Sequence, residues 1–257
     1  MDVKHSERIL AFWDYLAEQP ASRTHDSLHE LLGFVAGLIH ARQAYWLGAI
    51  RLLRRAGNDS LRGWRPGAME YWQPMDAFPQ VFRQGVRVIN DGHASEVVIN
   101  HARNAGRFRS VLLKDHVSPA FFQSWHYDAY YLQRGLPDCL FVAAPVNADA
   151  EAYYCFYRGT DDGPFTADDL AVAAFALRGL KWFQRLVMLD HGLLVAEQAL
   201  SPVERRILRY LLTDQSEQQI AAHMGQSPAT THKYVTTLYR KFNVSGRAGL
   251  TALWLRH

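Results

Sequence analysis

The chain contains 257 residues, of which 49% are hydrophobic and 21% charged, and its formal net charge at pH 7 is +3. This composition is that of an ordinary soluble globular protein and excludes the disordered and fibrous classes, while the length allows a medium-sized domain beside a small one. Because the sequence has no apolar run of about 18 residues and no basic-then-apolar leader, we expect neither a membrane span nor a secretion signal, and a cytoplasmic location.

The first part of the chain shows the periodicities of an α+β domain. Apolar residues recur at helical spacing in residues 6–19 and again in residues 26–41. Two strands are expected at Tyr45–Leu53 and Gly67–Trp72, separated by a turn region rich in Gly and Asn at Gly57–Gly63. This order of elements predicts two helices packed on a sheet that begins with an antiparallel pair.

Further elements are expected between residue 95 and the end of this part. A helix capped by Ser95 is predicted to extend to Asn104. Cys139–Val146 and Ala152–Arg158 have the pattern of a hairpin joined by the polar residues 147–151. One long amphipathic helix is predicted to start after Thr166 and to continue to about Asp190. It would close the first domain.

Helix starts in the last sixty or so residues are marked by capping residues. Ser201, Pro202 and Glu204 have the pattern of an N-cap, a first helical residue and a capping-box glutamate, and the helix is expected to run to about Leu212. Further caps are expected at Ser216 with Gln219, at Gly225 in a left-handed turn, at Ser227 before Pro228, and at Ser245. Because each cap contributes about 1 kcal/mol, the pattern predicts a small all-α domain of four helices.

The two predicted domains differ in charge. We place the boundary near residues 192–199, so that residues 1–192 form the first domain and residues 197–257 the second. From residue 197 onward, eight Lys or Arg stand against four Asp or Glu, a net charge of +4, which leaves 20 basic and 21 acidic residues elsewhere. A small basic domain beside a neutral one indicates that only the C-terminal part meets a polyanion.

The third predicted helix of the second domain has two distinct faces. Its apolar face carries Thr231, Val235, Leu238 and Phe242, and its other faces carry Thr230, Lys233, Thr236, Thr237 and Arg240. Two short helices followed by such a helix form a helix-turn-helix, in which the later helix fits the DNA major groove. The pattern therefore predicts a DNA-binding domain.

The segment LSPVERRILRYLLTDQSEQQIAAHMGQSPATTHKYVTTLYRKFNV resembles the LuxR-type, or GerE-type, DNA-binding domain of bacterial regulators. The matching positions are Leu200, Pro202, Glu204, Leu208, Ser216, Ile220, Ala221, Ser227, Thr230, Tyr239, Arg240, Lys241 and Val244. The resemblance implies base contacts from His232, Lys233 and Thr236, and phosphate contacts from Thr230, Arg240 and Lys241. A solvated helix face is the alternative interpretation for Lys233, Arg240 and His232.

Three positions depart from the family pattern. Ala229 stands where Lys or Arg is common, His232 where Lys is common, and Tyr234 where His is common. The bases that this chain would read therefore do not follow from the family pattern alone.

The resemblance also implies partners. A domain of this size contacts few base pairs, so we expect a homodimer that binds an inverted repeat in a promoter and acts on RNA polymerase. The long helix at Asp168–Leu189 is one candidate for the self-contact, and the alternative is that it covers the sheet of the first domain.

The first domain resembles a GAF-type or PAS-type sensor in its order of elements and in the phrase FTADDL. We expect an α/β/α fold that binds a small molecule, with no metal and no cofactor. Seven aromatic residues are candidates for the ligand pocket, and ordinary core packing is the alternative for each: Trp46, Trp64, Tyr71, Trp72, Trp125, Tyr127 and Tyr130.

Other sensors and activities are less well supported by the sequence. A receiver domain would require alternating strands and helices, whereas this chain begins with two predicted helices. The residues that bind acyl-homoserine lactones cannot be placed here with their spacing.

A metal site and an enzyme are also less well supported. His25 and His29 lack an obvious third metal ligand. Ser124, His126 and Asp128 lie too close in sequence to converge on one centre, which disfavours an enzyme. We therefore expect a ligand-controlled, non-enzymatic regulator; the alternatives are control by a protein partner or by abundance, and an enzyme with an appended helix-turn-helix.

Overall fold

The structure, a computed structural model of the chain, describes residues 3–52, 59–74, 85–89, 94–194 and 199–255. It contains two compact units: the sheet unit of residues 1–13 and 29–181, and the helical unit of residues 14–28 and 182–257. Residues 57–58 of the predicted turn and residues 195–198 of the predicted domain boundary lie outside the described residues.

The chain passes between the two units three times. The passages lie within α1 (Val3–Glu18), within α2 (Thr24–Leu38) and at the start of α8 (Lys181–Asp190). Both N-terminal helices were expected, at residues 6–19 and 26–41, and the structure has both with bounds shifted by a few residues.

The sheet unit contains a five-stranded antiparallel sheet in the order β2-β1-β5-β4-β3. The strands are β1 (Gln43–Arg51), β2 (Trp64–Tyr71), β3 (Arg109–Leu112), β4 (Asp138–Asn147) and β5 (Ala150–Arg158). The predicted strand pair β1–β2 and the predicted hairpin β4–β5 are both present. Every residue of the central strand β5 is buried, because helices cover both faces of the sheet.

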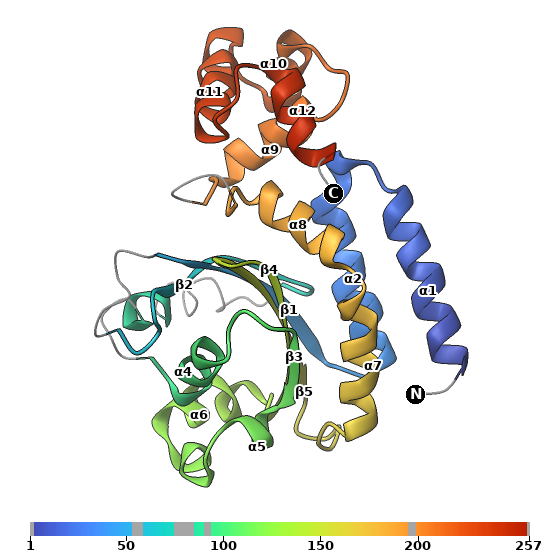
Figure 1. Cartoon of the computed structure of the whole chain (residues 1–257), viewed down its shortest axis with the longest axis vertical. Coiled ribbons are helices and arrows are strands. Elements are labelled where there is room, and N and C mark those ends of the chain that lie inside the picture. The colour runs from blue at the N-terminus through green and yellow to red at the C-terminus, as the bar shows by residue number, and fades with distance from the viewer. Residues whose placement is uncertain (1–2, 53–58, 75–84, 90–93, 195–198, 256–257) are drawn as a thin grey trace. The chain divides into compact units, whose positions relative to one another are not determined.

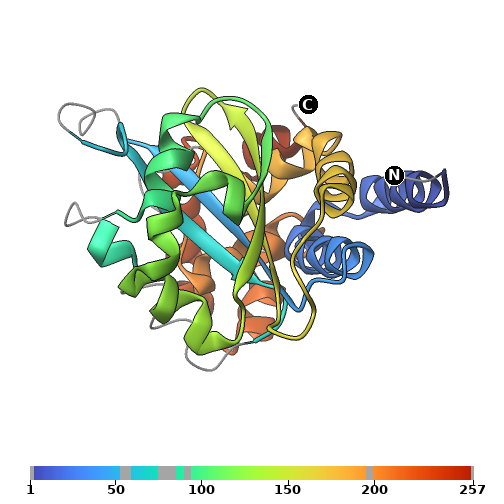
Figure 2. The same ribbon diagram turned by 90° about the horizontal axis from the view of Figure 1, so that it is seen from below.

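Helices form a layer on each side of this sheet (Figure 1, Figure 2). One layer consists of α4 (Glu96–Arg103), α5 (Leu113–His116), η3 (Pro119–Gln123), α6 (Trp125–Tyr130) and η4 (Leu132–Arg134). The other consists of α7 (Ala167–Arg178) and the parts of α1 and α2 that belong to this unit. The predicted α/β/α architecture is confirmed. No helix among the described residues combines the length and the apolar character that a membrane span requires.

The predicted long helix after Thr166 is wrong, because the chain breaks it into α7 and α8 at Gly179 and Leu180. Thr166 caps α7 through a capping box with Asp169, so the predicted start is correct. At the break, the Trp13 ring lies so close to Gly179 that it leaves no room for a Cβ atom there. The Trp13 indole also donates a hydrogen bond to the Ala176 carbonyl. A bulky ring seated on the backbone thus coincides with the end of the helix.

Two further expectations about the sheet unit need correction. The hairpin turn comprises only residues 148–149, because Asn147 pairs with Ala150, and Glu151 is a strand residue rather than part of a polar connection. Ser95 stands at the N-cap position of α4 as predicted, but its side chain makes no capping hydrogen bond. No element is predicted between residues 105 and 137, although β3 and the short helices lie there.

The helical unit contains the four expected helices: α9 (Pro202–Leu211), α10 (Glu217–Met224), α11 (Pro228–Lys241) and α12 (Arg247–Leu255). Both predicted capping boxes, at Ser201 and Ser216, are formed, and Ser227 caps α11. Gly225 ends α10 with a φ of 62°, in the left-handed region that favours glycine. The predicted cap at Ser245 is wrong, because α12 begins at Arg247 and Gly246 directly precedes it.

The core of the four helices also includes the end of α8. Its buried residues are Leu189, Leu200, Ile207, Leu208, Leu211, Ile220, Val235, Leu238, Phe242, Leu250 and Trp254. An ion pair of 3.2 Å joins Arg209 of α9 to Asp190, whose side chain is 1% exposed. The Leu200 amide donates a hydrogen bond of 2.9 Å to the His191 carbonyl. The four-helix domain is therefore packed against residues that precede it.

Candidate functional site

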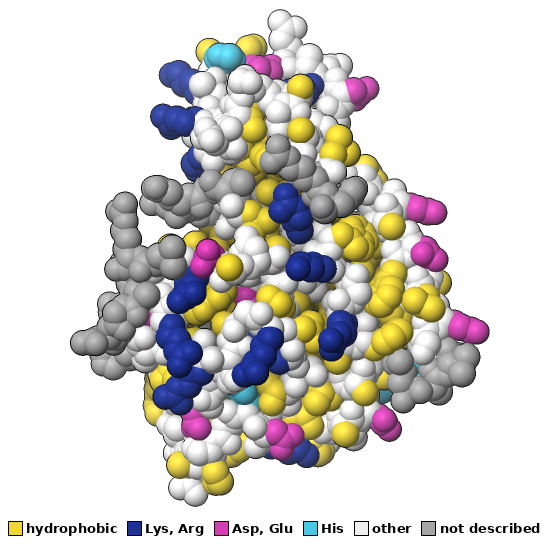
Figure 3. All heavy atoms as spheres, in the orientation of Figure 1, with side chains coloured by type: hydrophobic (Ala, Val, Ile, Leu, Met, Phe, Trp, Pro, Cys, Tyr) yellow, Lys and Arg dark blue, Asp and Glu magenta, His cyan; other side chains and the backbone are white. Residues whose placement is uncertain are grey.

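Helix α11 separates a buried face from an exposed face, as its sequence predicts. Thr231, Val235 and Leu238 are buried. Five of the six residues predicted to contact DNA are exposed, namely Thr230, His232, Lys233, Thr236 and Arg240, and Lys241 is half-buried. Basic side chains are visible over α11 at the edge of the domain (Figure 3). This helix therefore presents polar and basic groups along one accessible side.

The exposed residues differ in how far their polar atoms are already engaged. The His232 ring donates a hydrogen bond of 2.9 Å to the Glu217 carboxylate, and the Thr236 hydroxyl donates to the His232 carbonyl in its own helix. Within the described residues, Lys233 and Arg240 have no ion pair or hydrogen bond from their side chains. These two cations are thus the most available to an incoming phosphate or base.

Lys241 is held inside the domain. Its ammonium group lies 2.6 Å from Glu204, which also closes the capping box at the start of α9. Burial alone would raise the pKa of Glu204, but hydrogen bonds from Lys241 and Ser201 outweigh it and lower the pKa. A phosphate at Lys241 would therefore compete with this carboxylate.

A cavity lies in the sheet unit between the sheet and α4. Its first lobe has a volume of about 110 Å³ and its second a volume of about 160 Å³, and the lobes share Tyr45, Leu47 and Phe141 among their walls. The walls are mostly apolar, as is usual for sites that bind small molecules. The cavity is thus the candidate ligand site of the described residues.

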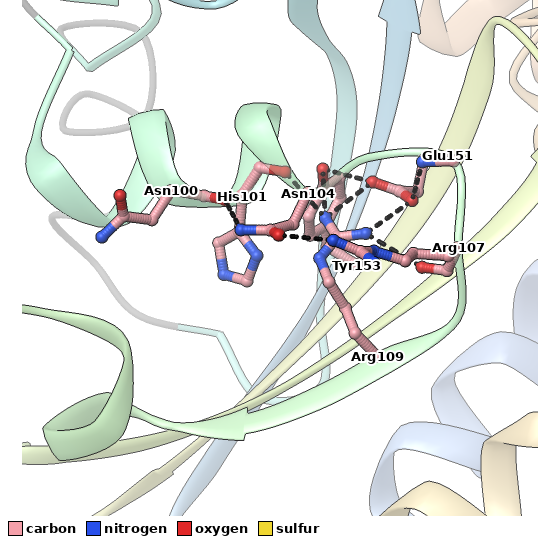
Figure 4. A network of polar contacts seen from close by, with 8 residues as sticks. Asn100, His101, Asn104, Arg107, Arg109, Glu151 and Tyr153 are labelled. Atoms are coloured by element: carbon pink, nitrogen blue, oxygen red, sulfur yellow. Dashed lines mark hydrogen bonds and ion pairs between the residues drawn. The ribbon is translucent and has the colours of Figure 1, made fainter.

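A polar network joins α4, β3 and β5 (Figure 4), and its residues His101 and Tyr153 line the first lobe. Both carboxylate oxygens of Glu151, which is fully buried, accept hydrogen bonds of 2.8 Å from Arg109. The Tyr153 hydroxyl donates to Glu151 and accepts from Arg109, and Arg109 also donates to the His101 carbonyl. These bonds fix Tyr153 in the wall of the first lobe and hold the start of β3 against α4.

His101 lines the first lobe and is 7% exposed. Its ring packs against His116 at 4.1 Å and edge-on against Phe141 at 5.0 Å and Tyr153 at 5.1 Å. Neither ring nitrogen has a hydrogen-bond partner among the described residues. Burial, followed by the neighbouring His116 and Arg109, holds the pKa of His101 well below its ordinary value. The ring is therefore neutral at physiological pH.

The seven aromatic residues proposed for the pocket fall into two groups. Trp64 lines the first lobe, and Tyr71 and Tyr130 line the second. The other four lie elsewhere: Trp46 alternates with the lining residues Tyr45 and Leu47 along β1, Trp72 packs on Gly33 of α2, Trp125 is 72% exposed, and the Tyr127 hydroxyl donates to the Pro137 carbonyl. Only three of the seven are thus brought together at the cavity.

Sequence reasoning missed most of the residues that line the cavity. The two-residue alternation of a strand could have found Tyr45 and Leu47, because neighbouring residues point to opposite faces. In the predicted helix at Ser95–Asn104, His101 follows Val97 by four residues and therefore shares its apolar face. Met69 and Arg134 gave no such signal, because their place at the cavity depends on strand pairing and on unpredicted short helices.

The C-terminal part of the helical unit matches a known family. Residues 198–254 match the family described as bacterial regulatory proteins, luxR family, or GerE. These residues form a LuxR-family helix-turn-helix domain. The LuxR-family domain thus includes α9 to α12 and all six residues predicted to contact DNA. None of the curated proteins shows significant sequence similarity to the chain.

Solved structures resemble the fold at low sequence identity. SdiA in complex with octanoyl-rac-glycerol aligns over 97% of this chain and 92% of that one, with 14% identity and a TM-score of 0.50. The VqsR LBD domain from Pseudomonas aeruginosa aligns over 68% of this chain and 92% of that one, with 13% identity and a TM-score of 0.50. Escherichia coli SdiA in another crystal form has a TM-score of 0.40 at 15% identity, over 97% of this chain and 94% of that one, too low to support an argument. The likeness concerns the fold alone.

Proposed function

We propose that this protein is a sequence-specific DNA-binding transcription regulator of bacteria. In this proposal residues 197–257 bind DNA, and residues 1–192 sense a signal and support dimerisation. The observation that carries it is the exposed polar side of α11 within a LuxR-family domain. Because the opposite side of α11 is packed in the core, a duplex can reach these residues without unfolding the helix.

We assign the contacts along α11 as follows. His232, Lys233 and Thr236 face the bases, while Thr230 and Arg240 contact phosphates. Lys241 is a phosphate contact only if it leaves Glu204, and its removal would also disturb the cap of α9. A variant at Lys241 therefore mixes a DNA effect with a stability effect, whereas Lys233 offers a clean test.

The proposed assembly follows from the size of the reading domain. One copy contacts few base pairs, so two copies on a two-fold axis would read an inverted repeat in a promoter and act on RNA polymerase from there. The net charge of +4 from residue 197 onward favours contact with DNA by this part of the chain. We propose a cytoplasmic location, where such a regulator meets the chromosome.

We further propose that a small molecule in the cavity of the sheet unit controls DNA binding. A mostly apolar cavity with a few polar groups supports this, and the similar fold of SdiA was solved with octanoyl-rac-glycerol. The chain passes between the units within α1 and α2 and at the start of α8, and the end of α8 packs in the core of the LuxR-family domain. A ligand that favours one conformation of these helices would bias the DNA-binding domain.

The decisive experiment compares Lys233→Ala with Arg206→Ala, an exposed basic residue on α9. Footprinting on the promoter region first defines the operator, and fluorescence anisotropy then measures affinity for it and for unrelated DNA. Lys233→Ala should weaken operator binding by about 1 to 3 kcal/mol and unrelated DNA less, and Arg206→Ala should leave the preference for the operator unchanged. Absence of any protected sequence with the wild-type protein, at every salt concentration, would refute the proposal.

Control by a ligand has its own test. Mass spectrometry of the denatured protein would identify a co-purified small molecule, and operator affinity would be compared before and after its removal. Equal affinities would favour regulation by a protein partner or by abundance. An enzyme is not favoured, because Ser124 donates to the Phe121 carbonyl and caps α6, Asp128 accepts from Gln133, and His126 stacks on Tyr130. These side chains have separate partners and do not form a catalytic relay.

A further inference from the structure

The first lobe of the cavity contains a polar ring whose hydrogen-bonding groups are unused. Both nitrogens of His101 lack partners among the described residues, although the ring is buried. A neutral imidazole has one donor and one acceptor, and leaving them unmade in an apolar setting is costly. His101 is held in place by ring contacts with His116, Phe141 and Tyr153 rather than by hydrogen bonds of its own nitrogens. The ring is thus positioned before any ligand arrives.

The charges nearest this lobe are already compensated. Among the described residues that line the first lobe, only Arg65 has a full charge, and it pairs with Asp59 at 2.8 Å and donates to the Trp64 carbonyl. Behind Tyr153, Arg109 is matched by both oxygens of Glu151. Burial keeps the His101 ring neutral. A charged ligand group would find no free counter-charge among the described residues of this lobe, so the cost of its desolvation would not be offset.

We infer that the first lobe takes an uncharged, largely apolar molecule with one hydroxyl or carbonyl group, which hydrogen-bonds to His101. This inference rests on the proposed function, because it names the chemical class of the ligand that the sensor binds. Leu47, Val98 and Phe141 line both lobes and would contact the apolar part. The lobes, about 110 and 160 Å³, have sizes comparable with a cavity of about 150 Å³ that holds benzene, so the ligand is a small ring or a short chain.

The test uses three probes of matched shape: 4-phenyl-1-butanol, n-butylbenzene and 4-phenylbutanoate. A hydroxyl can serve either tautomer of His101, because it both donates and accepts. The full-length wild type is compared with His101→Phe, which keeps a ring against Phe141 and Tyr153, and with Val98→Ala, which trims an apolar wall. Dissociation constants are measured by titration calorimetry. The midpoint of thermal unfolding of each variant, measured without probe, shows whether the variant folds.

We expect His101→Phe to lower the affinity for the alcohol about tenfold and to leave the affinity for butylbenzene unchanged or higher. Val98→Ala should weaken both by a similar factor. In the wild type, the carboxylate should bind at least about tenfold more weakly than the alcohol. The midpoint of His101→Phe without probe should equal or exceed that of the wild type, because an unpaired polar ring is replaced by an apolar one.

Equal changes for alcohol and hydrocarbon in His101→Phe would overturn the role of His101, as would a lowered midpoint without probe. A carboxylate that binds the wild type as tightly as the alcohol would overturn the neutral ligand class. Failure of all three probes to bind the wild type would overturn the inference as a whole. The proposed function would then still stand or fall on the footprint and on the co-purified molecule, so the two failures are distinguishable. If His101→Phe does not fold, the wild-type comparison of alcohol and carboxylate still decides the ligand class.

Discussion

The candidate functional groups lie on the surface in one unit and in the core in the other. In the LuxR-family domain these groups stand on the outside of α11, and the core behind them is purely structural. In the sheet unit the candidate groups, such as His101 and Tyr153, are part of the core itself. Substitutions on the outer face should therefore separate function from stability, whereas substitutions around the cavity should change both.

The largest effect is expected at Glu151 in the sheet unit. Glu151→Ala leaves the guanidinium of Arg109 and the hydroxyl of Tyr153 without their buried acceptor. Breaking a buried pair by removing one partner costs about 3 to 5 kcal/mol. Urea unfolding, monitored by hydrogen exchange, should show this loss of unfolding free energy in the sheet unit.

The control is Arg42→Ala in the same unit, because the Arg42 side chain is 59% exposed in its ion pair with Asp162 and its removal should cost much less. If Glu151→Ala and Arg42→Ala destabilise the protein equally, the polar network behind the cavity has no special role in the stability of the sheet unit.

A second effect of about 3 kcal/mol is expected in the core of the LuxR-family domain. Leu238 is fully buried on the inner side of α11, so Leu238→Ala removes packing and leaves a cavity. Thr236→Ala, on the exposed side of the same helix, should leave the free energy of unfolding nearly unchanged and should weaken operator binding. Equal losses of stability from the two variants would contradict the division of α11 into a structural face and a DNA-binding face.

The same contrast explains what could be predicted from the sequence. Each serine that caps a helix of the LuxR-family domain accepts a hydrogen bond from the backbone N–H three residues later: Ser201, Ser216 and Ser227. Because these bonds are local, the sequence alone locates the starts of α9, α10 and α11. The break at Gly179 coincides with a contact from Trp13, whose hydrogen bond to the Ala176 carbonyl spans a sequence separation of 163 residues. Local rules cannot anticipate such a contact.

The candidate sites follow the same division. The outer face of α11 follows from helical spacing, and the structure exposes Lys233 and Arg240 as that spacing predicts. The cavity depends on which strands pair and in which register, so aromatic content indicated Trp64 but also Trp46, which alternates with the lining residues. Composition therefore predicts that an aromatic core exists and not which rings line its cavity.

A third prediction concerns pH and His126, which lines the second lobe. Burial, and then the charge of Arg134, lower the pKa of His126 to about 4. Because the unfolded chain has a histidine pKa of about 6.5, it binds a proton between these values that the folded chain does not. The contribution of neutral His126 to the free energy of unfolding is therefore fully present above about pH 6.5. It falls as the pH drops toward about 4, by at most about 1.4 kcal/mol per pH unit.

Urea unfolding of the wild type and of His126→Gln between about pH 7.5 and 5 would measure this effect. The wild type should lose more stability than the variant on acidification, and His101 contributes equally to both. Parallel curves would show that the ring takes up a proton without cost, and thus that water already reaches it in the folded protein.

The smallest effect is also the sharpest comparison, because a serine stands at an N-cap position in both units. The Ser216 hydroxyl accepts a hydrogen bond from the backbone N–H of Gln219, and the side-chain oxygen of Gln219 accepts one from the backbone N–H of Ser216. Ser216→Ala should therefore cost about 1 kcal/mol, measured by urea unfolding. At the start of α4, Ser95 makes no capping bond, and its buried hydroxyl has no partner among the described residues.

Ser95→Ala should accordingly cost nothing or stabilise the protein slightly, because it removes a buried hydroxyl that pairs with nothing. The sequence context gives both serines the same expected role, so only the hydrogen bonds distinguish the two variants. If both substitutions cost about 1 kcal/mol, Ser95 caps α4 after all and the α4 wall of the cavity is built by the same local rules as the LuxR-family domain. If only Ser216→Ala does, the start of α4 is held by its packing on the sheet, and the shape of the cavity depends on contacts that no local pattern encodes.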